Sequence, residues 1–354
     1  MNNLLLESST LLYNLIMIAG DIALLFLVSR KLPRWIAITN FGLLALVGLV
    51  AAVTLGEDSF GVVRLLAYGL FLHGVILLVG LAILLHPMKR KMAIASAVLA
   101  VVLGAIAIDA FLIEPYWLEV SKVQLSVPKL TTPLKIVVVA DLQTDVWGEY
   151  ERQSLRKVME QDADMILLAG DYFQAANRDR EEVLIKQLQA FLKEINFNAR
   201  GGAYAVRGNF DEPNWSEMFA GLPIKIFPET GTLKLPGLCL TGLSLEDSFD
   251  ANKDISGCDH YHIVLGHAPD FALGKVHADL LIAGHTHGGQ VRLPFIGPLF
   301  IPSDVPRKWA AGVTDIGRNR TLLVSRGIGM EREFAPRMRF LCRPELVVIE
   351  LIPA

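Results

Sequence analysis

The feature that most constrains the fold of this chain is a series of four apolar runs within residues 1–113. They lie at approximately 11–28, 36–55, 62–85 and 92–113. Each run is close to the ~20 residues that a helix needs to cross the hydrocarbon core of a bilayer. Four such runs in series leave no polar face for water, so a soluble helical bundle is the less favoured alternative. The sequence therefore predicts a transmembrane region of four helices over residues 1–113.

The composition agrees with this prediction and excludes one class of partner. Charged residues make up 19% of the 354 residues and hydrophobic residues 53%, whereas a soluble domain usually has about 25% charged residues. The net charge is only −3, and the sequence has no stripe of Lys and Arg that would follow a phosphate backbone. We therefore expect the lipid bilayer as a partner, and no nucleic acid.

Basic residues between the runs predict the orientation in the membrane. Two loops carry them: Arg30, Lys31 and Arg34 between the first two runs, and Lys89, Arg90 and Lys91 between the last two. The positive-inside rule places both loops in the cytoplasm. The chain is then a multi-pass protein of the cytoplasmic (inner) membrane, with its C-terminal part on the periplasmic or extracellular side. The odd number of cysteines, Cys239, Cys258 and Cys342, leaves the redox compartment open.

Polar residues inside the predicted helices have two interpretations. Asp21, His73 and Asp109 could form a conduction path. Contacts between helices or at helix ends are the favoured interpretation, because these residues are few and scattered.

The pattern changes after residue 113. Residues 114–134 contain three prolines and are expected to be a linker, of which 117–127 could pair as an edge strand. From residue 135 to 354, short β-rich runs alternate with helical patterns at 149–160 and 179–195. The clearest predicted strands are 135–140, 165–169, 203–206, 263–265, 280–283, 322–325 and 346–351. This alternation predicts an α/β domain over residues 135–354.

Five of these strands end in residues that are typical metal ligands or that adjoin them. The segments are Asp141-Leu142-Gln143, Gly170-Asp171, Gly208-Asn209-Phe210-Asp211, Gly266-His267 and Gly284-His285-Thr286-His287. Ligand-binding residues of α/β sheets gather beyond the carboxyl ends of the strands. Carboxylate, amide and imidazole groups together suit divalent ions such as Mn²⁺, Fe²⁺ or Zn²⁺. Each motif alone is weak evidence, but the ordered set is highly specific.

This ordered set resembles the calcineurin-like metallophosphoesterase superfamily, whose pattern is D-x-H, G-D, G-N-H-[DE], G-H and G-H-x-H. The resemblance spans roughly residues 134–352. Gly284–Pro298 and Val324–Gly329 look like the membrane-bound or exported bacterial branch. The resemblance implies a four-layer αββα sandwich with the site at one edge.

The resemblance also implies a role for each residue. Asp171 would bridge two divalent metal ions, with Mn²⁺ the first choice and Fe²⁺, Zn²⁺ or Mg²⁺ as alternatives. Asp141, Gln143 and His287 would bind the first ion, and Asn209, His267 and His285 the second. A hydroxide between the ions would attack phosphorus, with Asp171, Asn209 and Asp211 as the catalytic set.

Two positions depart from the family pattern. Gln143 replaces the histidine of D-x-H and is a weaker ligand, so the first metal should bind loosely or be a harder ion such as Mn²⁺ or Mg²⁺. Phe210 replaces the histidine of G-N-H, which in the family contacts the phosphate and can protonate the leaving group. Without that acid, substrates with good leaving groups, such as phosphoanhydrides, are favoured.

These observations lead to one expected function and two rivals. We expect metal-dependent hydrolysis of phosphoester or pyrophosphate bonds in a membrane-associated or lipid-linked substrate. The first rival is a UDP-2,3-diacylglucosamine pyrophosphatase of lipid A synthesis, because that branch also lacks the histidine by resemblance, although its substrate is cytoplasmic. The second is a non-catalytic metal-binding pseudoenzyme. A transporter is disfavoured, because four helices with few polar residues form a poor pathway.

Other segments near the motifs keep two interpretations. Arg207, Arg292 and Arg326 could bind phosphate oxygens or form structural ion pairs. The apolar, proline-rich segment Leu293–Trp309 could be a plain loop, or it could face the membrane and admit a lipid tail.

Overall fold

The computed structural model describes residues 2–30 and 34–354; Lys31, one of the basic residues used for the orientation, lies outside them. The chain divides into two compact units. The helical unit contains Met1–Ile113 together with Glu331–Arg337, and the sheet unit contains Glu114–Met330 and Met338–Ala354. Each unit is described by itself.

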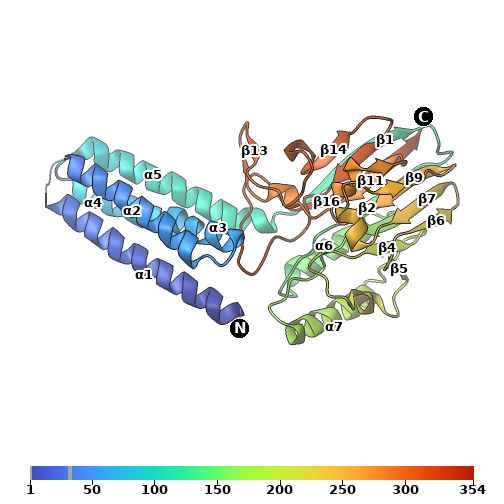
Figure 1. Cartoon of the computed structure of the whole chain (residues 1–354), viewed down its shortest axis with the longest axis horizontal. Helices are drawn as coiled ribbons and strands as arrows, with labels where there is room; N and C mark the ends of the chain where they lie inside the picture. The colour runs from blue at the N-terminus through green and yellow to red at the C-terminus, as the bar shows by residue number, and fades with distance from the viewer. Residues whose placement is uncertain (1, 31–33) are drawn as a thin grey trace. The chain divides into compact units, whose positions relative to one another are not determined.

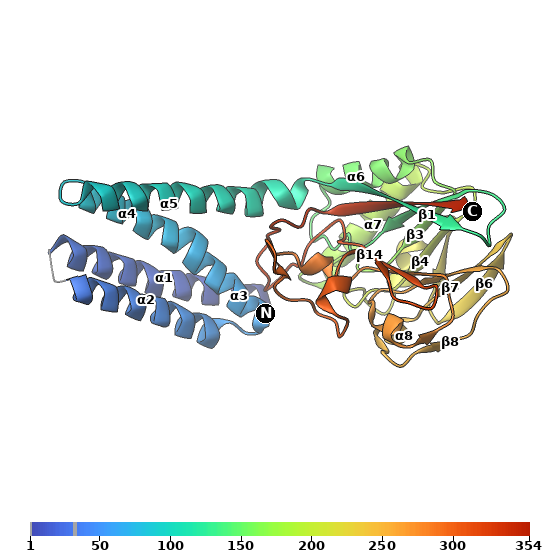
Figure 2. The ribbon, with the colours of Figure 1, turned by 90° about the horizontal axis from the view of Figure 1, so that it is seen from above.

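Within its described residues, the helical unit contains four helices long and apolar enough to cross a membrane. The first two are α1 (Asn2–Ser29) and α2 (Arg34–Leu55). The third is continuous through α3 (Ser59–Tyr68), the π-turn η1 (Gly69–His73) and α4 (Gly74–Leu85). The fourth runs from α5 (Arg90–Ile108) through the π-turn η2 (Asp109–Ile113) to the turn η3 (Glu114–Tyr116). Only 11–22% of the apolar stretch of each helix is buried inside the structure, so most of its apolar side chains point outward, as they do toward lipid. Figures 1 and 2 show α1 beside α2 and α4 beside α5.

The polar residues of this unit join two helices. His73 Nδ1 lies 2.7 Å from Asp21 Oδ2, and His73 Nε2 lies 2.9 Å from Asn14 Oδ1. Asp21 and His73 are both buried. The pair therefore links α1 to η1, which agrees with the interhelical interpretation of these residues.

Two six-stranded sheets form the body of the sheet unit (Figure 1). The first has the order β1 (Glu119–Val127), β16 (Glu345–Pro353), β2 (Leu134–Val139), β3 (Met165–Leu168), β4 (Ala203–Val206), β5 (Ile224–Phe227). The second has the order β14 (Gly312–Asp315), β15 (Thr321–Val324), β11 (Leu280–Ala283), β9 (Tyr261–Leu265), β7 (Leu238–Gly242), β6 (Gly231–Leu235). The edge strand expected at 117–127 forms as β1, which pairs in parallel with β16.

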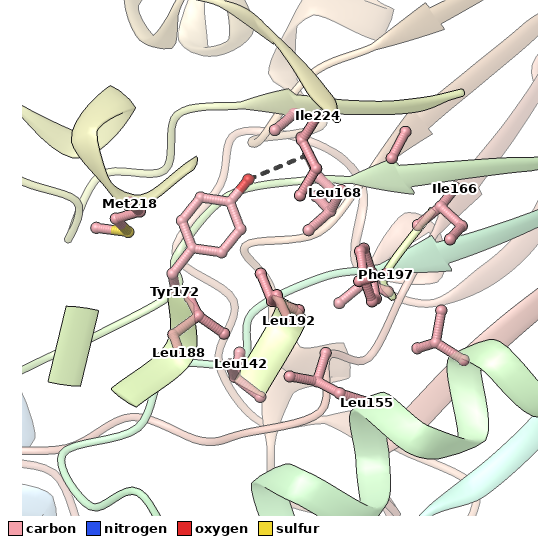
Figure 3. Packing of buried hydrophobic residues seen from close by; sticks show 14 of the residues in the cluster. Leu142, Leu155, Ile166, Leu168, Tyr172, Leu188, Leu192, Phe197, Met218 and Ile224 are labelled. Atoms are coloured by element: carbon pink, nitrogen blue, oxygen red, sulfur yellow. Dashed lines mark hydrogen bonds between the residues drawn. The ribbon is translucent and has the colours of Figure 1, made fainter. Parts of the chain in front are cut away.

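The alternation of side chains along the strands builds two cores in layers. In β2, Ile136 and Val138 point into the core between the sheets, while Val137 and Val139 point to the opposite face. That opposite face is covered by α6 (Glu149–Glu160) and α7 (Arg178–Glu194), whose buried side chains appear in Figure 3. The expected sandwich of two sheets is thereby confirmed.

The outer face of the second sheet has a thinner cover than the resemblance implies. Short segments pack there, namely β8 (Asp254–Ile255), η5 (Asp270–Leu273) and β10 (Lys275–Val276). Phe271 of η5 is fully buried against this face.

The strand directions gather the motifs at one edge. β2, β3 and β4 are parallel, as are β9 and β11. The carboxyl ends of parallel strands meet at the same edge of a sheet. The backbone N–H of His285, just after β11, donates to the carboxylate of Asp141, just after β2, at 2.9 Å. The two edges therefore converge on a single site.

Candidate metal centre

Five of the predicted ligands occupy a backbone conformation that side chains rarely adopt. The φ angles are 48° at Asp141, 32° at Gln143, 54° at Asp171, 66° at His285 and 47° at His287. A left-handed conformation at a residue with a Cβ costs of the order of 1–3 kcal/mol and persists where the surroundings enforce it. The repeated occurrence just past strand ends indicates that the backbone is bent to aim these side chains into the site.

The loop after β4 lies very close to the loop after β3. A Cβ on Gly208 would lie 2.1 Å from the backbone nitrogen of Asp171, so only glycine fits there. The carboxylate of Asp211 joins the two loops, because it accepts from the N–H groups of Gly208 at 2.7 Å, Asp171 at 2.9 Å and Tyr172 at 2.8 Å. Asp211, which we expected in the catalytic set, thus positions the loop that carries Asn209 and Phe210.

Asp171, His267 and His285 form a compact ligand cluster. One ligand atom of each lies within 4.8 Å of the others, and all three side chains are buried. His267 Nδ1 donates to the carbonyl of Ala169 at 2.8 Å, which leaves Nε2 facing Asp171 Oδ2 at 3.2 Å and Asn209 Oδ1 at 2.8 Å. The structure therefore brings together Asp171, Asn209, His267 and His285, the four residues expected to share or bind the second ion.

His285 is oriented from the far side of the site. Its Nε2 donates to the carbonyl of Pro302 at 2.7 Å, which leaves Nδ1 as the ligand nitrogen. The ring of Phe249, in α8 (Leu245–Phe249), lies against it with ring centroids 4.9 Å apart. An imidazole whose second nitrogen donates to a backbone carbonyl is a usual arrangement of a metal ligand.

Two of the three residues expected to bind only the first ion, Gln143 and His287, contact each other. His287 Nε2 bonds to Gln143 Oε1, and Gln143 Nε2 donates to Gln174 Oε1 at 2.9 Å. Asp141 Oδ1 lies 3.9 Å from His267 Nδ1, so this group adjoins the Asp171 cluster. Gln174, which the sequence pattern did not indicate, orients Gln143 so that its amide oxygen points toward His287.

The charges of the site call for a cation. Burial raises the pKa of Asp141 to about 7 and that of Asp211 to about 7. Burial alone lowers the pKa of His267, but the carboxylates of Asp171 and Asp141 outweigh it and raise that pKa to about 9. Burial lowers the pKa of His285 to about 4, so this imidazole is neutral and able to bind a metal. Buried carboxylates that hold a proton on a neighbouring histidine fit a divalent ion, which replaces that proton.

One buried residue beside the site was missed from the sequence. Arg339 is fully buried and donates to the carbonyls of Gly329 at 3.0 Å, Arg326 at 2.7 Å and Cys342 at 3.0 Å. Its Nη2 also lies 3.3 Å from His287 Nδ1. Arg339 lies in an irregular segment without a recognisable motif, so only the three-dimensional structure reveals it.

The three arginines near the motifs have structural partners. Arg207 donates to the carbonyl of Asp211 at 2.9 Å, and Arg292 donates to that of Gly288 at 3.1 Å. Arg326 pairs with Glu345 and Glu119, each at 3.0 Å. These contacts favour the structural interpretation, in which the arginines stabilise the loops around the site.

Comparison with known proteins agrees with the geometry. The family model for calcineurin-like phosphoesterases matches residues 134–289. The phosphodiesterase YaeI of Escherichia coli is 26% identical over 266 residues, which are 68% of this chain and 90% of the relative. The metallophosphoesterase YkuE of Bacillus subtilis is 29% identical over 259 residues, 68% of this chain and 87% of the relative. Cj0846 of Campylobacter jejuni, also named a metallophosphoesterase, is 27% identical over 252 residues, 66% of this chain and 63% of the relative.

Residues 134–289 thus form a calcineurin-like phosphoesterase domain. This domain, together with relatives named phosphodiesterase and metallophosphoesterase, supports metal-dependent hydrolysis of phosphoester bonds, and the chain also carries apolar helices able to anchor it in a membrane.

Proposed function

We propose that this metallophosphoesterase cleaves phosphodiesters or phosphoanhydrides with good leaving groups, in a membrane-associated substrate. The observation that carries the proposal is Phe210, which follows the exposed ligand Asn209. Its side chain cannot donate a proton, and its N–H is already bonded to Asp171 Oδ1 at 2.8 Å. A leaving group that is stable as an anion needs no acid at this position.

The donor set of the site supports two divalent ions, with Mn²⁺ as the first choice. Asp171, Asn209, His267 and His285 would hold one ion, and Asp171, Asp141, Gln143 and His287 the other. Bound there, such ions supply an activated water and neutralise the charge of phosphate oxygens. The chain itself orients the ligands through Ala169, Pro302 and Gln174, and excludes bulk water by burying all of them except Asn209.

The name of one relative agrees with a diester substrate, since YaeI is a phosphodiesterase. A phosphodiester carries one negative charge, so it demands fewer cationic side chains than a monoester does. Arg207 and Arg326 bond to Asp211 and Glu345 of their own chain. This is consistent with a substrate that needs fewer cationic side chains.

The cysteines support a catalytic domain outside the cytoplasm. Cys239 of β7 and Cys258 form a disulfide, and Cys342 is free and buried. Disulfides persist in the periplasm and outside the cell and are rare in the cytoplasm. The basic loops lead to the same side. This location disfavours the cytoplasmic UDP-2,3-diacylglucosamine substrate.

A substrate panel tests the proposal. The purified full-length protein with Mn²⁺ should hydrolyse bis(p-nitrophenyl) phosphate and an aryl pyrophosphate, and should leave an alkyl monoester nearly intact. Faster cleavage of the alkyl monoester would contradict the assignment of Phe210. A complete lack of turnover on the activated substrates at saturating metal would favour the pseudoenzyme, for which the replacements at Gln143 and Phe210 are the supporting observation.

A further inference from the structure

A hairpin with an apolar tip follows the last metal motif directly. Its strands are β12 (Arg292–Leu293) and β13 (Gly297–Pro298), and we call residues 292–299 the apolar hairpin. Phe295 at the tip is fully exposed, and Ile296 and Leu299 are 62% and 48% exposed. In Figure 1 the hairpin stands off the two sheets of its unit. Large apolar side chains gathered on an exposed tip usually mark an interaction surface.

The hairpin is ordered rather than a loose loop. Ile296 N donates to Leu293 O at 3.2 Å, and Leu299 N donates to Val291 O at 3.3 Å. Phe295 has a φ of 66°, a conformation that favours glycine or asparagine in a tight turn. Phenylalanine is unfavourable in this backbone conformation, yet it occupies the position and its side chain is exposed at the tip. We therefore expect the side chain, rather than the turn itself, to be what this position supplies.

Both ends of the hairpin connect to the metal ligands. The first strand begins five residues after His287 in the sequence. On the return side, the carbonyl of Pro302 accepts from His285 Nε2, and the carbonyl of Ala310 accepts from Thr286 Oγ1 at 2.7 Å. The base of the hairpin is therefore anchored to the segment that carries His285 and His287.

Cations flank the apolar tip. Arg292 begins the hairpin, and the turn η7 (Arg307–Trp309), which packs beside β13, exposes Arg307 and Lys308. Apolar side chains next to Lys and Arg are the combination that binds the surface of anionic bilayers.

The chain between the fourth apolar span and β1 is too short to let the start of the sheet unit move far from a bilayer that contains this span. Only Trp117 and Leu118 lie between the turn η3 (Glu114–Tyr116), which ends the fourth apolar span, and the start of β1. Two residues extend at most about 7 Å. Tyr116 and Trp117 are both about half exposed, as aromatic residues at a membrane interface are. A tether this short gives the sheet unit a high effective concentration at the membrane surface.

We infer that the apolar hairpin dips into the boundary between headgroups and acyl chains, and that the substrate is an amphiphile whose phosphate enters the metal centre from the bilayer. This inference rests on the proposed function, because it names the substrate class of the same site. The occupant of the tip is lipid, rather than a second protein.

A depth measurement tests the contact with lipid. Phe295→Cys in the full-length protein adds the one reactive thiol, because Cys342 is buried and the other cysteines are paired. The labelled protein, carrying the fluorophore NBD, is reconstituted into vesicles of phosphatidylcholine and phosphatidylglycerol. We expect spin-labelled lipids to quench this label at least about threefold more than a label at Val183→Cys, an exposed apolar position on α7. Equal quenching at both positions overturns the inference, and so does shielding from aqueous iodide without quenching by lipid.

A pair of substrates with one leaving group tests the consequence for catalysis. The wild type should cleave p-nitrophenyl hexadecyl phosphate in mixed micelles at least about tenfold more efficiently than p-nitrophenyl methyl phosphate. Phe295→Ser with Ile296→Ser should abolish this preference and keep the rate on the methyl ester within about twofold, while Val183→Ser should change neither. An unaltered preference in the double variant overturns the inference and leaves the proposed function standing. If the wild type cleaves neither ester, the proposed function fails, and the depth measurement still decides whether the hairpin meets lipid.

Discussion

The backbone N–H of Phe210 donates to Oδ1 of Asp171 at 2.8 Å. The residue that replaces the expected acid is thereby fixed to the carboxylate at the centre of the metal site. The same bond is available to every residue except proline at position 210, so the side chain can be exchanged without releasing the loop. This relationship makes position 210 suitable for a test of how the leaving group is protonated.

Phe210→His should raise the rate selectively on poor leaving groups. The new imidazole could protonate an alkoxide, and general acid catalysis contributes typically about 10²–10⁴-fold. With a dialkyl phosphodiester we expect the rate to rise at least about tenfold. With bis(p-nitrophenyl) phosphate we expect the rate to change less than about twofold. A Brønsted plot of rate against leaving-group pKa measures this directly. Phe210→Leu is the matched control, and an equal gain with leucine would show that space, not proton transfer, was limiting.

Gln143→His should strengthen the site of the first ion. Imidazole is a better ligand than an amide oxygen for Mn²⁺, Fe²⁺ or Zn²⁺, and Gln143 already contacts His287 and Gln174. We expect the Mn²⁺ concentration that gives half-maximal activity to fall about tenfold. Titration of activity and of bound metal by mass spectrometry checks the change. An unchanged metal requirement would place Gln143 outside the coordination sphere.

Metal binding should depend on pH with a defined sign. Because the pKa of His267 is raised from 6.5 to about 9, Nε2 carries a proton at neutral pH that must leave before a metal binds. Affinity for Mn²⁺ should therefore rise by about tenfold per unit from about pH 7 to about pH 8.5 and level off above about pH 9. Below about pH 7 the dependence should steepen, because Asp141 also becomes protonated. Calorimetry in buffers of different ionisation enthalpy counts the released protons, and a flat profile would refute the proton exchange at His267.

Arg339→Met should destabilise the sheet unit. The substitution removes hydrogen bonds to the carbonyls of Gly329, Arg326 and Cys342 in a fully buried position. The loss should be about 3 kcal/mol in the free energy of unfolding, because the carbonyls remain without donors. Arg339→Lys should recover little of this, since one ammonium cannot replace the fork of the guanidinium. Thermal unfolding of the detergent-solubilised protein measures both variants, and near-wild-type stability of Arg339→Met would contradict the role.

The strands that carry the ligands, and the ligands themselves, could be predicted from short stretches of neighbouring residues. Each ligand follows an apolar strand within a few residues, and helices 149–160 and 178–194 carry clear periodic patterns, so strand ends and helices could be located from neighbouring residues alone. β5, β6, β7 and β14 were not predicted, because they are short and alternate weakly, and turns rather than helices separate several of them. Arg339, Gln174 and Phe249 act through partners far away in the sequence, and no local pattern reports such contacts.

The most direct test of the account compares two aspartates at opposite ends of β3. Asp171 follows the strand and lies in the ligand cluster, whereas Asp164 precedes it and bonds to the N–H of Lys135 and to Arg200. Hydrolysis of bis(p-nitrophenyl) phosphate with saturating Mn²⁺ should fall by at least about a hundredfold in Asp171→Asn, together with its bound metal, and stay within about twofold of wild type in Asp164→Asn. Wild-type turnover and metal content in Asp171→Asn would contradict the assignment of this cluster as the catalytic metal centre.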